Sequence, residues 1–162
     1  MKTEIMFSKK SDEWCTPYDL FDSIAAEFGG FDMDVAANEK NTKCSYFCGL
    51  DTHEDGLTAK WMKKNWCNPP YSNVKGFAAK AVQEQKNGNL TVMLIPARTD
   101  TRFFHDYIYQ KPGVEVRFIK GRIKFINPEN ELLRGTKMNG SNNAAPFPSM
   151  LVIFRPLKDQ PS

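Results

Sequence analysis

The chain has 162 residues, 41% of them hydrophobic and 12% aromatic, which is enough for one globular domain with a real core. No apolar run approaches the length of a membrane span, and residues 1–10 lack the apolar stretch of a signal peptide. We therefore expect a cytoplasmic protein without a membrane partner, in which the four cysteines are reduced thiols. We also expect a single domain over residues 1–162, with flexible tails at about 1–10 and 157–162.

The formal net charge of +3 permits a polyanionic partner but does not require one. The charge is unevenly distributed, because residues 117–137 contain six Lys or Arg and only two Glu. This segment is either a solvated face or a surface that binds phosphates, and the charge pattern alone leaves both interpretations open.

The first predicted helix begins at Thr16-Pro17, with Thr16 as the N-cap and Pro17 at the first helical position. Apolar residues recur at helical spacing after it, and Gly29-Gly30 ends the helix. The next segment, Phe31 to Val35, reads as a strand.

The rest of the chain alternates short apolar runs with segments of helical periodicity. In chain order these patterns first predict a short strand at Tyr46-Phe47, one or two helical turns over Leu57–Met62 and a strand over Lys64–Cys67. A helix from Val74 to Asn87-Gly88, a strand over Leu90–Ile95 and a helix around Phe103–Ile108 follow. The last predicted elements are strands over Val114–Ile119 and Ile123–Ile126, a loop over Asn127–Pro148 and a strand over Met150–Phe154. Helices that alternate with short buried strands indicate a three-layer α/β sheet in one compact domain.

The most informative motif is Asn68-Pro69-Pro70-Tyr71, which follows a predicted strand and precedes a predicted helix. An exocyclic amine is a poor nucleophile because its lone pair is delocalised into the ring. The side-chain carbonyl of Asn68 and the backbone carbonyl of Pro69 are suited to accept the two amine hydrogens, which turns the lone pair toward an electrophilic methyl group. Pro70 stiffens the loop, and Tyr71 offers a flat face for an extruded base. The alternative is an ordinary turn, since Asn-Pro and Pro-Pro also mark loops.

Two acidic residues are candidates for binding a ligand. Ligands of open α/β sheets lie beyond the carboxyl ends of the strands, and Asp34 and Asn68 both fall at such ends, so we expect them to face one crevice. Asp34 suits an ammonium or hydroxyl group, with loop capping as the alternative. Asp55 is placed to hydrogen-bond an adenine or ribose edge, with a plain Asp-Gly turn as the alternative.

Metal and covalent chemistry are disfavoured by the residue patterns. Cys44, Cys48 and His53 provide three metal-ligating side chains within ten residues, but they lack the paired spacing and fourth ligand of zinc sites, so we expect no metal. His105 reads as a surface residue. The chain contains no glycine-rich phosphate loop and no Gly-x-Ser-x-Gly nucleophile motif, and amino methylation needs neither a metal nor a covalent nucleophile.

Taken in this order, the motifs resemble the small, phage-type DNA N-6-adenine methyltransferases of the Dam group, over about residues 12–156. The motifs that carry the resemblance are Asp12-Glu13-Trp14-Cys15-Thr16-Pro17, Asp34-Val35-Ala36-Ala37, Asp55-Gly56-Leu57 with Trp61, Asn68-Pro69-Pro70-Tyr71, Gly121-Arg122-Ile123-Lys124-Phe125 and Ala145-Pro146-Phe147-Pro148-Ser149.

The resemblance implies a class I methyltransferase fold, a Rossmann-like three-layer sandwich that uses S-adenosylmethionine. The implied reaction methylates N6 of adenine in double-stranded DNA after base flipping. A phage-encoded enzyme of this kind acts in the host cell cytoplasm. Its catalytic loop would be formed by Asn68, Pro69, Pro70 and Tyr71.

The resemblance also implies the cofactor contacts. Thr16 and Pro17 would lie against the methionine end of the cofactor, and Asp34 would reach it from the first strand. Asp55 would sit near the nucleoside. In place of the glycine-rich turn usual in this fold the chain has Ala36 and Ala37, whose small side chains let a cofactor approach.

The predicted DNA contacts come from the basic segment and the loop after it. They are Lys120, Arg122, Lys124, Arg134 and Lys137. No segment is large enough to form a separate target-recognition domain, so we assign sequence reading to the loop Asn127–Pro148.

Two other functions remain open at this point. The same four-residue loop serves methyltransferases that act on glutamine amides in proteins or on RNA bases. A non-enzymatic nucleic-acid-binding module would explain the basic segment but leaves the positions of Asp34 and Asn68 as coincidence. The oligomeric state and the target sequence do not follow from the residues.

Overall fold

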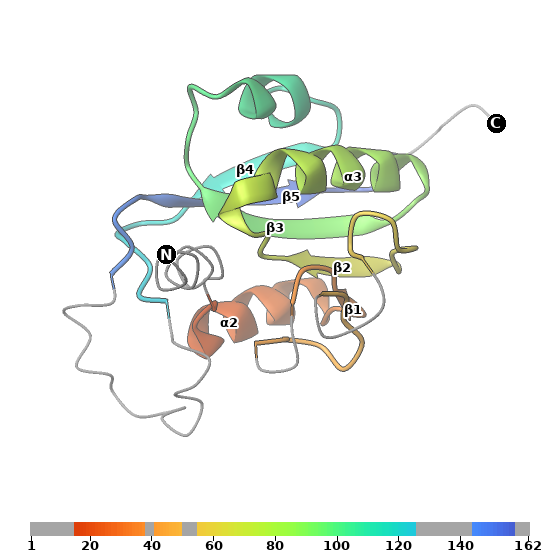
Figure 1. Ribbon diagram of the computed structural model, residues 1–162, viewed down its shortest axis with the longest axis horizontal. Helices are drawn as coiled ribbons and strands as arrows, with labels where there is room; N and C mark the ends of the chain where they lie inside the picture. Colours follow the sequence, from red (N-terminus) through yellow and green to blue (C-terminus); the bar gives the residue numbers. More distant parts are fainter. Residues whose placement is uncertain (1–14, 38–40, 50–54, 126–143, 158–162) are drawn as a thin grey trace, which may run out of the picture.

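The computed structural model describes residues 15–37, 41–49, 55–125 and 144–157. In this part of the chain five strands form one sheet, and helices lie on both of its faces (Figure 1). The strands are β1 (Met33–Asp34), β2 (Lys64–Cys67), β3 (Leu90–Pro96), β4 (Val114–Phe118) and β5 (Ser149–Phe154). The helices are α2 (Tyr18–Phe28), the 3-10 turn η1 (Tyr71–Asn73), α3 (Val74–Lys86) and the π-helix η2 (Phe104–Ile108).

The strand order is β1-β2-β3-β5-β4. β1, β2 and β3 pair in parallel, and β5 is antiparallel to both β3 and β4. β4 therefore runs in the same direction as the first three strands. Those four strands all end at one edge of the sheet, at Asp34, Cys67, Pro96 and Phe118, and we call this edge the carboxyl edge.

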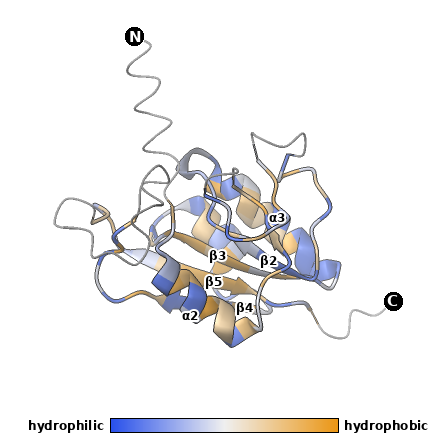
Figure 2. Cartoon of the chain, turned by 90° about the horizontal axis from the view of Figure 1, so that it is seen from below, coloured by the Kyte–Doolittle hydropathy of each residue, from blue (hydrophilic) through white to orange (hydrophobic). Residues whose placement is uncertain are grey.

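Alternate residues of β2, β3 and β5 supply two separate cores, as expected from the two-residue period of a strand. Met93 and Ile95 of β3 belong to the core beneath α3 and η2, whereas Val92 and Leu94 belong to the core beneath α2. Figure 1 shows α3 and α2 on opposite sides of the sheet, and Figure 2 shows β3 and β5 coloured mainly as hydrophobic. No helix within the described residues is long and apolar enough to cross a bilayer.

Most long elements agree with the sequence analysis. The strand predicted over Lys64–Cys67 has those bounds, and β3, α3 and β5 differ from their predicted bounds by a residue or two. Gly29 ends α2 in the left-handed conformation, with φ of 75°. These segments are long apolar runs or strongly periodic stretches, so local pattern alone was enough to locate them.

The predicted start of the first helix is wrong by one position. Pro17 is the N-cap of α2 in an extended conformation (φ −59°, ψ 141°), so it is not the first helical residue, and Thr16 is not the cap. The Thr16 hydroxyl instead accepts a hydrogen bond from Asn68. The Thr16 side chain, which local preference predicts as the helix N-cap, is thus used in a tertiary hydrogen bond instead.

Other elements are shorter than predicted. β1 covers Met33–Asp34 because the chain turns after Asp34, although backbone hydrogen bonds to β2 continue on both sides of it. Residues 55–59 form a single turn in place of the turns predicted over Leu57–Met62. Only isolated bridges, Asp34 with Phe47 and Lys124 with Ala144, replace the two strands predicted at 46–47 and 123–126. Most of the loop predicted over 127–148 lies outside the described residues.

Trp66 is the central aromatic residue of the core beneath α2, so its substitution tests the packing of this core. It is 1% exposed, and its ring lies edge-on to Phe21 with centroids 5.1 Å apart. We expect Trp66→Ala to lower the free energy of unfolding by about 3–5 kcal/mol, because it leaves a large cavity. Urea unfolding followed by circular dichroism measures the change.

Phe118→Ala is the matched control. Phe118 is 68% exposed, so we expect its truncation to change the free energy of unfolding by less than about 0.5 kcal/mol. Equal losses in the two variants would contradict the assigned packing.

Candidate active site

The Asn68-Pro69-Pro70-Tyr71 loop leaves the carboxyl edge at the end of β2 and leads directly into α3. Pro70 is extended (φ −61°, ψ 141°), and its carbonyl accepts the backbone N–H of Asn73 at 3.0 Å. The Asn73 side chain caps α3 by accepting the N–H of Gly76 at 3.1 Å. A Cβ atom on Gly76 would lie 2.6 Å from that side-chain oxygen, so any larger residue there would displace the capping side chain. The loop is therefore held between a strand end and a capped helix.

Asn68 is joined to the segment before α2. Its side-chain nitrogen donates to the Thr16 hydroxyl at 3.1 Å, across 52 positions of sequence. Thr16 is 2% exposed and Asn68 is partly exposed, so this hydrogen bond is partly buried. An amide whose nitrogen is held in this way directs its carbonyl oxygen away from Thr16. The contact brings two of the predicted site segments together and orients the amide of Asn68.

Tyr71 contacts an aromatic residue that the sequence analysis left without a role. Its ring lies edge-to-face with Phe147, with centroids 5.1 Å apart and planes at 78°. The segment around Phe147 is tied to the neighbouring strand ends, because Pro148 accepts the N–H of Ala97 at 2.9 Å. The resemblance had marked residues 145–149 as a motif, but no local pattern indicated that this motif reaches the catalytic loop.

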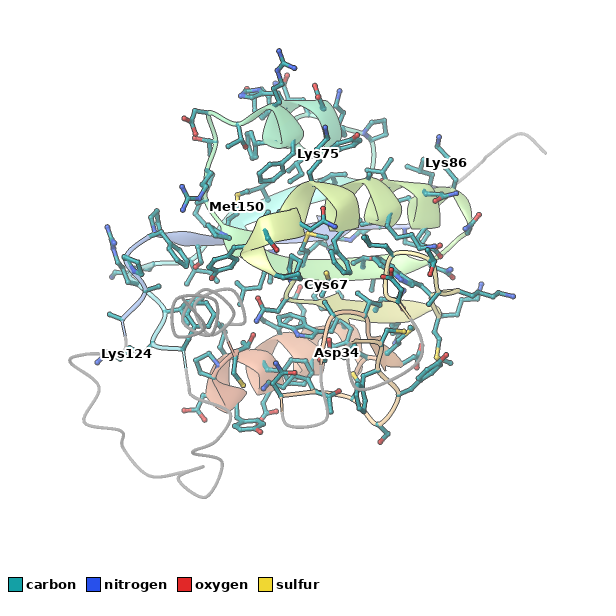
Figure 3. The ribbon with its side chains drawn as sticks, in the orientation of Figure 1. Asp34, Cys67, Lys75, Lys86, Lys124 and Met150 are labelled. Atoms are coloured by element: carbon teal, nitrogen blue, oxygen red, sulfur yellow. The ribbon has the colours of Figure 1, made fainter. Side chains whose placement is uncertain are left out.

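Asp34 lies at the carboxyl edge, one strand away from Asn68 (Figure 3 labels Asp34 together with Cys67, the residue before Asn68). The carboxylate is 2% exposed. It accepts the backbone N–H of Lys43 at 2.9 Å and that of Ala36 at 3.3 Å. Asp34 therefore shapes the loop that follows β1, as in the loop-capping interpretation.

Burial controls the ionisation of Asp34. Desolvation raises the pKa of its carboxyl group to about 6, and the hydrogen bonds from Lys43 and Ala36 and the Lys43 charge oppose that rise. A cation beside this carboxylate would lower the pKa again. The site thus favours a positively charged group next to Asp34.

Two distant glycines pack against the backbone that follows β1. A Cβ atom on Gly49 would lie 1.5 Å from the Ala37 carbonyl oxygen, and one on Gly56 would lie 2.0 Å from that of Val35. The Ala37 N–H also donates to the Cys48 carbonyl at 2.8 Å. Glycine therefore allows close packing of this turn, but the glycines come from later segments rather than from the turn itself. Gly56 was expected only as part of the Asp55-Gly56-Leu57 motif, and no sequence pattern indicated Gly49.

Asp55 lies in an exposed turn beside these residues. Its carboxylate accepts the N–H of Leu57 at 2.9 Å, as in a turn aspartate. The buried Trp61 ring donates to the Gly56 carbonyl at 2.7 Å and fixes the turn against Val35. Ala36 is partly exposed next to this turn, and Ala37 is buried.

The structure describes three of the five predicted DNA-binding residues. Lys120, Arg122 and Lys124 are exposed in the segment after β4, and Figure 3 labels Lys124 there. Arg134 and Lys137 lie outside the described residues. Arg117 is held by Glu27 and Glu115 at 2.7 and 2.6 Å, so it belongs to an ion-pair network rather than to a free basic surface.

None of the four cysteines, all of which lie in the described part of the chain, forms a disulfide. Burial, followed by the nearby Asp34 and Asp32 carboxylates, raises the pKa of Cys44 to about 12, and burial raises the pKa of Cys67 well above its ordinary value. Among the described residues no group of three or more His, Cys, Asp or Glu side chains is arranged to hold a metal ion. His105 is exposed, and His53 lies outside the described residues.

The raised pKa of Asp34 makes a testable contribution to stability. Below the unfolded value of about 3.8 both states are protonated. As the pH rises to about 6, the unfolded chain releases this proton before the folded chain does, so the fold loses stability. We expect the free energy of unfolding of the wild type, relative to Asp34→Asn, to fall by up to about 3 kcal/mol between pH 4 and pH 7.

Urea unfolding of both proteins at each pH measures this difference, and the carboxylates common to both cancel. If the free energies of unfolding of the two proteins run parallel from pH 4 to pH 7, the pKa of Asp34 is not raised in the folded state.

Comparison with known proteins identifies the family. The family model for DNA N-6-adenine-methyltransferase (Dam) matches residues 3–162. The chain is 29% identical over 166 residues to the DNA N-6-adenine-methyltransferase of Escherichia phage T1, an alignment that covers 91% of this chain and 64% of that protein. It is 35% identical over 154 residues to the enzyme of the same name from Haemophilus phage HP1 (strain HP1c1), covering 92% of this chain and 83% of that protein. Because the family model spans nearly all of its residues, the chain belongs to the DNA N-6-adenine-methyltransferase (Dam) family.

Proposed function

We propose that this protein transfers a methyl group from S-adenosylmethionine to N6 of adenine in double-stranded DNA. The observation that carries the proposal is the hydrogen bond from Asn68 to the buried Thr16, found in a chain of the Dam family. It joins the loop suited to hold an amine to the segment assigned to the cofactor. The relatives are phage proteins, so we propose the host cell cytoplasm as the place of action.

We also propose that residues 1–162 form one domain with the class I, Rossmann-like three-layer fold. The parallel pairing of β1, β2 and β3 supports this, as does the placement of α2 and α3 on opposite faces of the sheet. Ligands of such sheets lie beyond the carboxyl ends of the parallel strands. The candidate residues Asp34 and Asn68 occupy those ends.

The residues around the carboxyl edge fit S-adenosylmethionine, which when bound supplies an electrophilic methyl group on a positively charged sulfur. Asp34 offers a carboxylate to a cationic or hydroxyl-bearing ligand, in an orientation set by two backbone hydrogen bonds. Ala36 adds little bulk next to it. We assign the cofactor contacts to Thr16, Pro17, Asp34, Ala36, Ala37 and Asp55.

We assign catalysis to the Asn68-Pro69-Pro70-Tyr71 loop. The carbonyl oxygens of Asn68 and Pro69 would accept the two N6 hydrogens and strengthen these bonds as the amine gains positive charge. Holding the amine in line with the methyl group removes much of the entropic barrier. Tyr71 would stack on the flipped base, and stacking of about 1–3 kcal/mol offsets part of the few kcal/mol that base flipping costs.

We assign phosphate contacts to Lys120, Arg122 and Lys124, and to Arg134 and Lys137 outside the described residues. The first three are exposed after β4, whose end lies at the same edge of the sheet as the catalytic loop. Contacts of this kind make DNA binding weaken as salt increases.

The direct test is to incubate the protein with unmethylated plasmid and S-adenosylmethionine carrying a labelled methyl group, and then to map modified adenines by sequencing. Label in N6-methyladenine is the expected result. Label in RNA or in glutamine side chains would assign the same chemistry to another substrate. Absence of label together with failure to bind S-adenosylmethionine in calorimetry would favour a binding module.

Asn68→Ala removes the side-chain acceptor from the catalytic loop. We expect methyl transfer to fall by at least about 100-fold while the Kd for S-adenosylmethionine stays within a few-fold of the wild type, because the lost interaction acts mainly in the transition state. Single-turnover assays and calorimetry measure the two quantities.

Asn87→Ala serves as the control, since Asn87 is exposed at the far end of α3. It should retain wild-type turnover. Substantial methylation by Asn68→Ala would refute the assigned role.

Thr16→Val keeps the shape of Thr16 but removes the acceptor for the Asn68 amide nitrogen. We expect kcat to fall by about 10- to 100-fold, because a catalytic amide that is free to rotate loses its orientation. Thr16→Ser keeps the hydroxyl and should restore most of the rate. Equal kinetics for the Val and Ser variants would show that the hydrogen bond does not position Asn68.

A further inference from the structure

We propose that Phe118 contacts DNA directly, as an aromatic wedge that packs against a base step beside the flipped adenine. This inference rests on the proposed function, and it adds an apolar contact to a surface so far assigned only to basic side chains. The partner is duplex DNA with a locally unstacked step.

The exposure of Phe118 sets it apart from other apolar residues. It is 68% exposed, compared with 48% for Tyr109, 41% for Met62 and 40% for Tyr46. Because a phenyl ring makes no hydrogen bond to water, exposing the Phe118 ring to solvent does not stabilise the fold. Single exposed apolar residues are common on surfaces, and the inference therefore depends on where this one lies.

Phe118 lies at the carboxyl edge, where the catalytic loop also leaves the sheet. It pairs with Met150 of β5, and the next residue, Ile119, donates its N–H to Ser149 at 3.1 Å. β2 and β4 are separated by three strand spacings, or roughly 14 Å. This separation is similar to the width of the major groove, about 12 Å. One duplex can therefore reach both Phe118 and the loop after β2.

Exposed cations follow the ends of β3 and β4, at the edge of the sheet that carries this ring. Lys120, Arg122 and Lys124 follow it, and Arg98 and Arg102 follow the end of β3; all five are exposed. None of them makes an ion pair within the described residues, whereas Arg155, away from this edge, is bound to Glu115 at 2.7 Å. An exposed aromatic ring, at an edge whose cations make no ion pair with described residues, is complementary to a polymer of stacked bases and phosphates.

Base flipping creates the site that the ring would occupy. Extruding one adenine leaves its neighbours without a stacking partner, and apolar side chains of DNA-binding proteins insert at such steps. Stacking of a base on an aromatic ring does not depend on which base is present. Phe118 would then increase affinity without adding sequence specificity.

The test uses a fluorescein-labelled duplex that contains one adenine mapped as methylated in the plasmid assay. We expect Phe118→Ala to weaken binding by about 5- to 100-fold in fluorescence anisotropy, and Phe118→Trp to bind within a few-fold of the wild type. Met62→Ala is the control, since Met62 is an exposed apolar residue that precedes β2, at the opposite edge of the sheet. It should bind as the wild type does.

The salt dependence separates stacking from charge. Loss of an apolar contact should leave the slope of log Kd against log salt unchanged in Phe118→Ala. Lys120→Ala should reduce that slope by about 1, as expected for one lost phosphate contact.

The outcomes are distinguishable from a failure of the proposed function. If the wild-type protein methylates the duplex but Phe118→Ala binds it as tightly as the wild type does, the wedge is wrong and the methyltransferase assignment stands. Equal weakening by Met62→Ala would also overturn the wedge. If the wild type methylates no DNA, the proposed function itself fails.

Discussion

Parallel pairing of β1, β2 and β3 is the constraint on which the whole candidate site depends. Parallel strands end at one edge of a sheet, so polar residues that follow them meet although they are distant in sequence. Asp34 and Asn68 lie at the ends of two neighbouring strands in this way, and Thr16, from the segment before α2, accepts a hydrogen bond from Asn68. A one-residue slip of β2 would turn Trp66 out of its aromatic cluster and carry Asn68 away from Thr16. The same register therefore controls both the core and the site.

Asp34 serves the fold and the proposed site through one side chain. Burying a carboxylate is unfavourable, and the N–H groups of Ala36 and Lys43 offset part of that cost. The same two bonds orient the carboxylate before any ligand arrives. A group held in this way needs little reorganisation on binding, so loop capping and ligand binding are compatible roles for one residue.

The exposed cations fall into two groups. Those that form ion pairs belong to a structural region of the surface, and those that form none with described residues belong to the proposed binding region. Arg117 and Arg155 both bind Glu115, and their hydrogen bonds lower its pKa to about 2. Exposed pairs of this kind contribute little to stability. Their main effect is to remove Arg117 from the cations that face a polyanion. Among the described residues of the basic segment, Lys120, Arg122 and Lys124 remain exposed after the end of β4.

The sequence by itself determined β2, β3, β5 and α3, because continuous apolar runs and helical periodicity are local properties. Its motifs also indicated the family, which the match of the family model over residues 3–162 confirms. Only the tertiary structure decided that Thr16 binds Asn68 rather than capping α2, and that Tyr71 meets Phe147. The physical reason is that a buried polar group such as the Thr16 hydroxyl must find a hydrogen-bond partner wherever packing brings one near. Which partner that is depends on strand order and register, and no local pattern of residues specifies these.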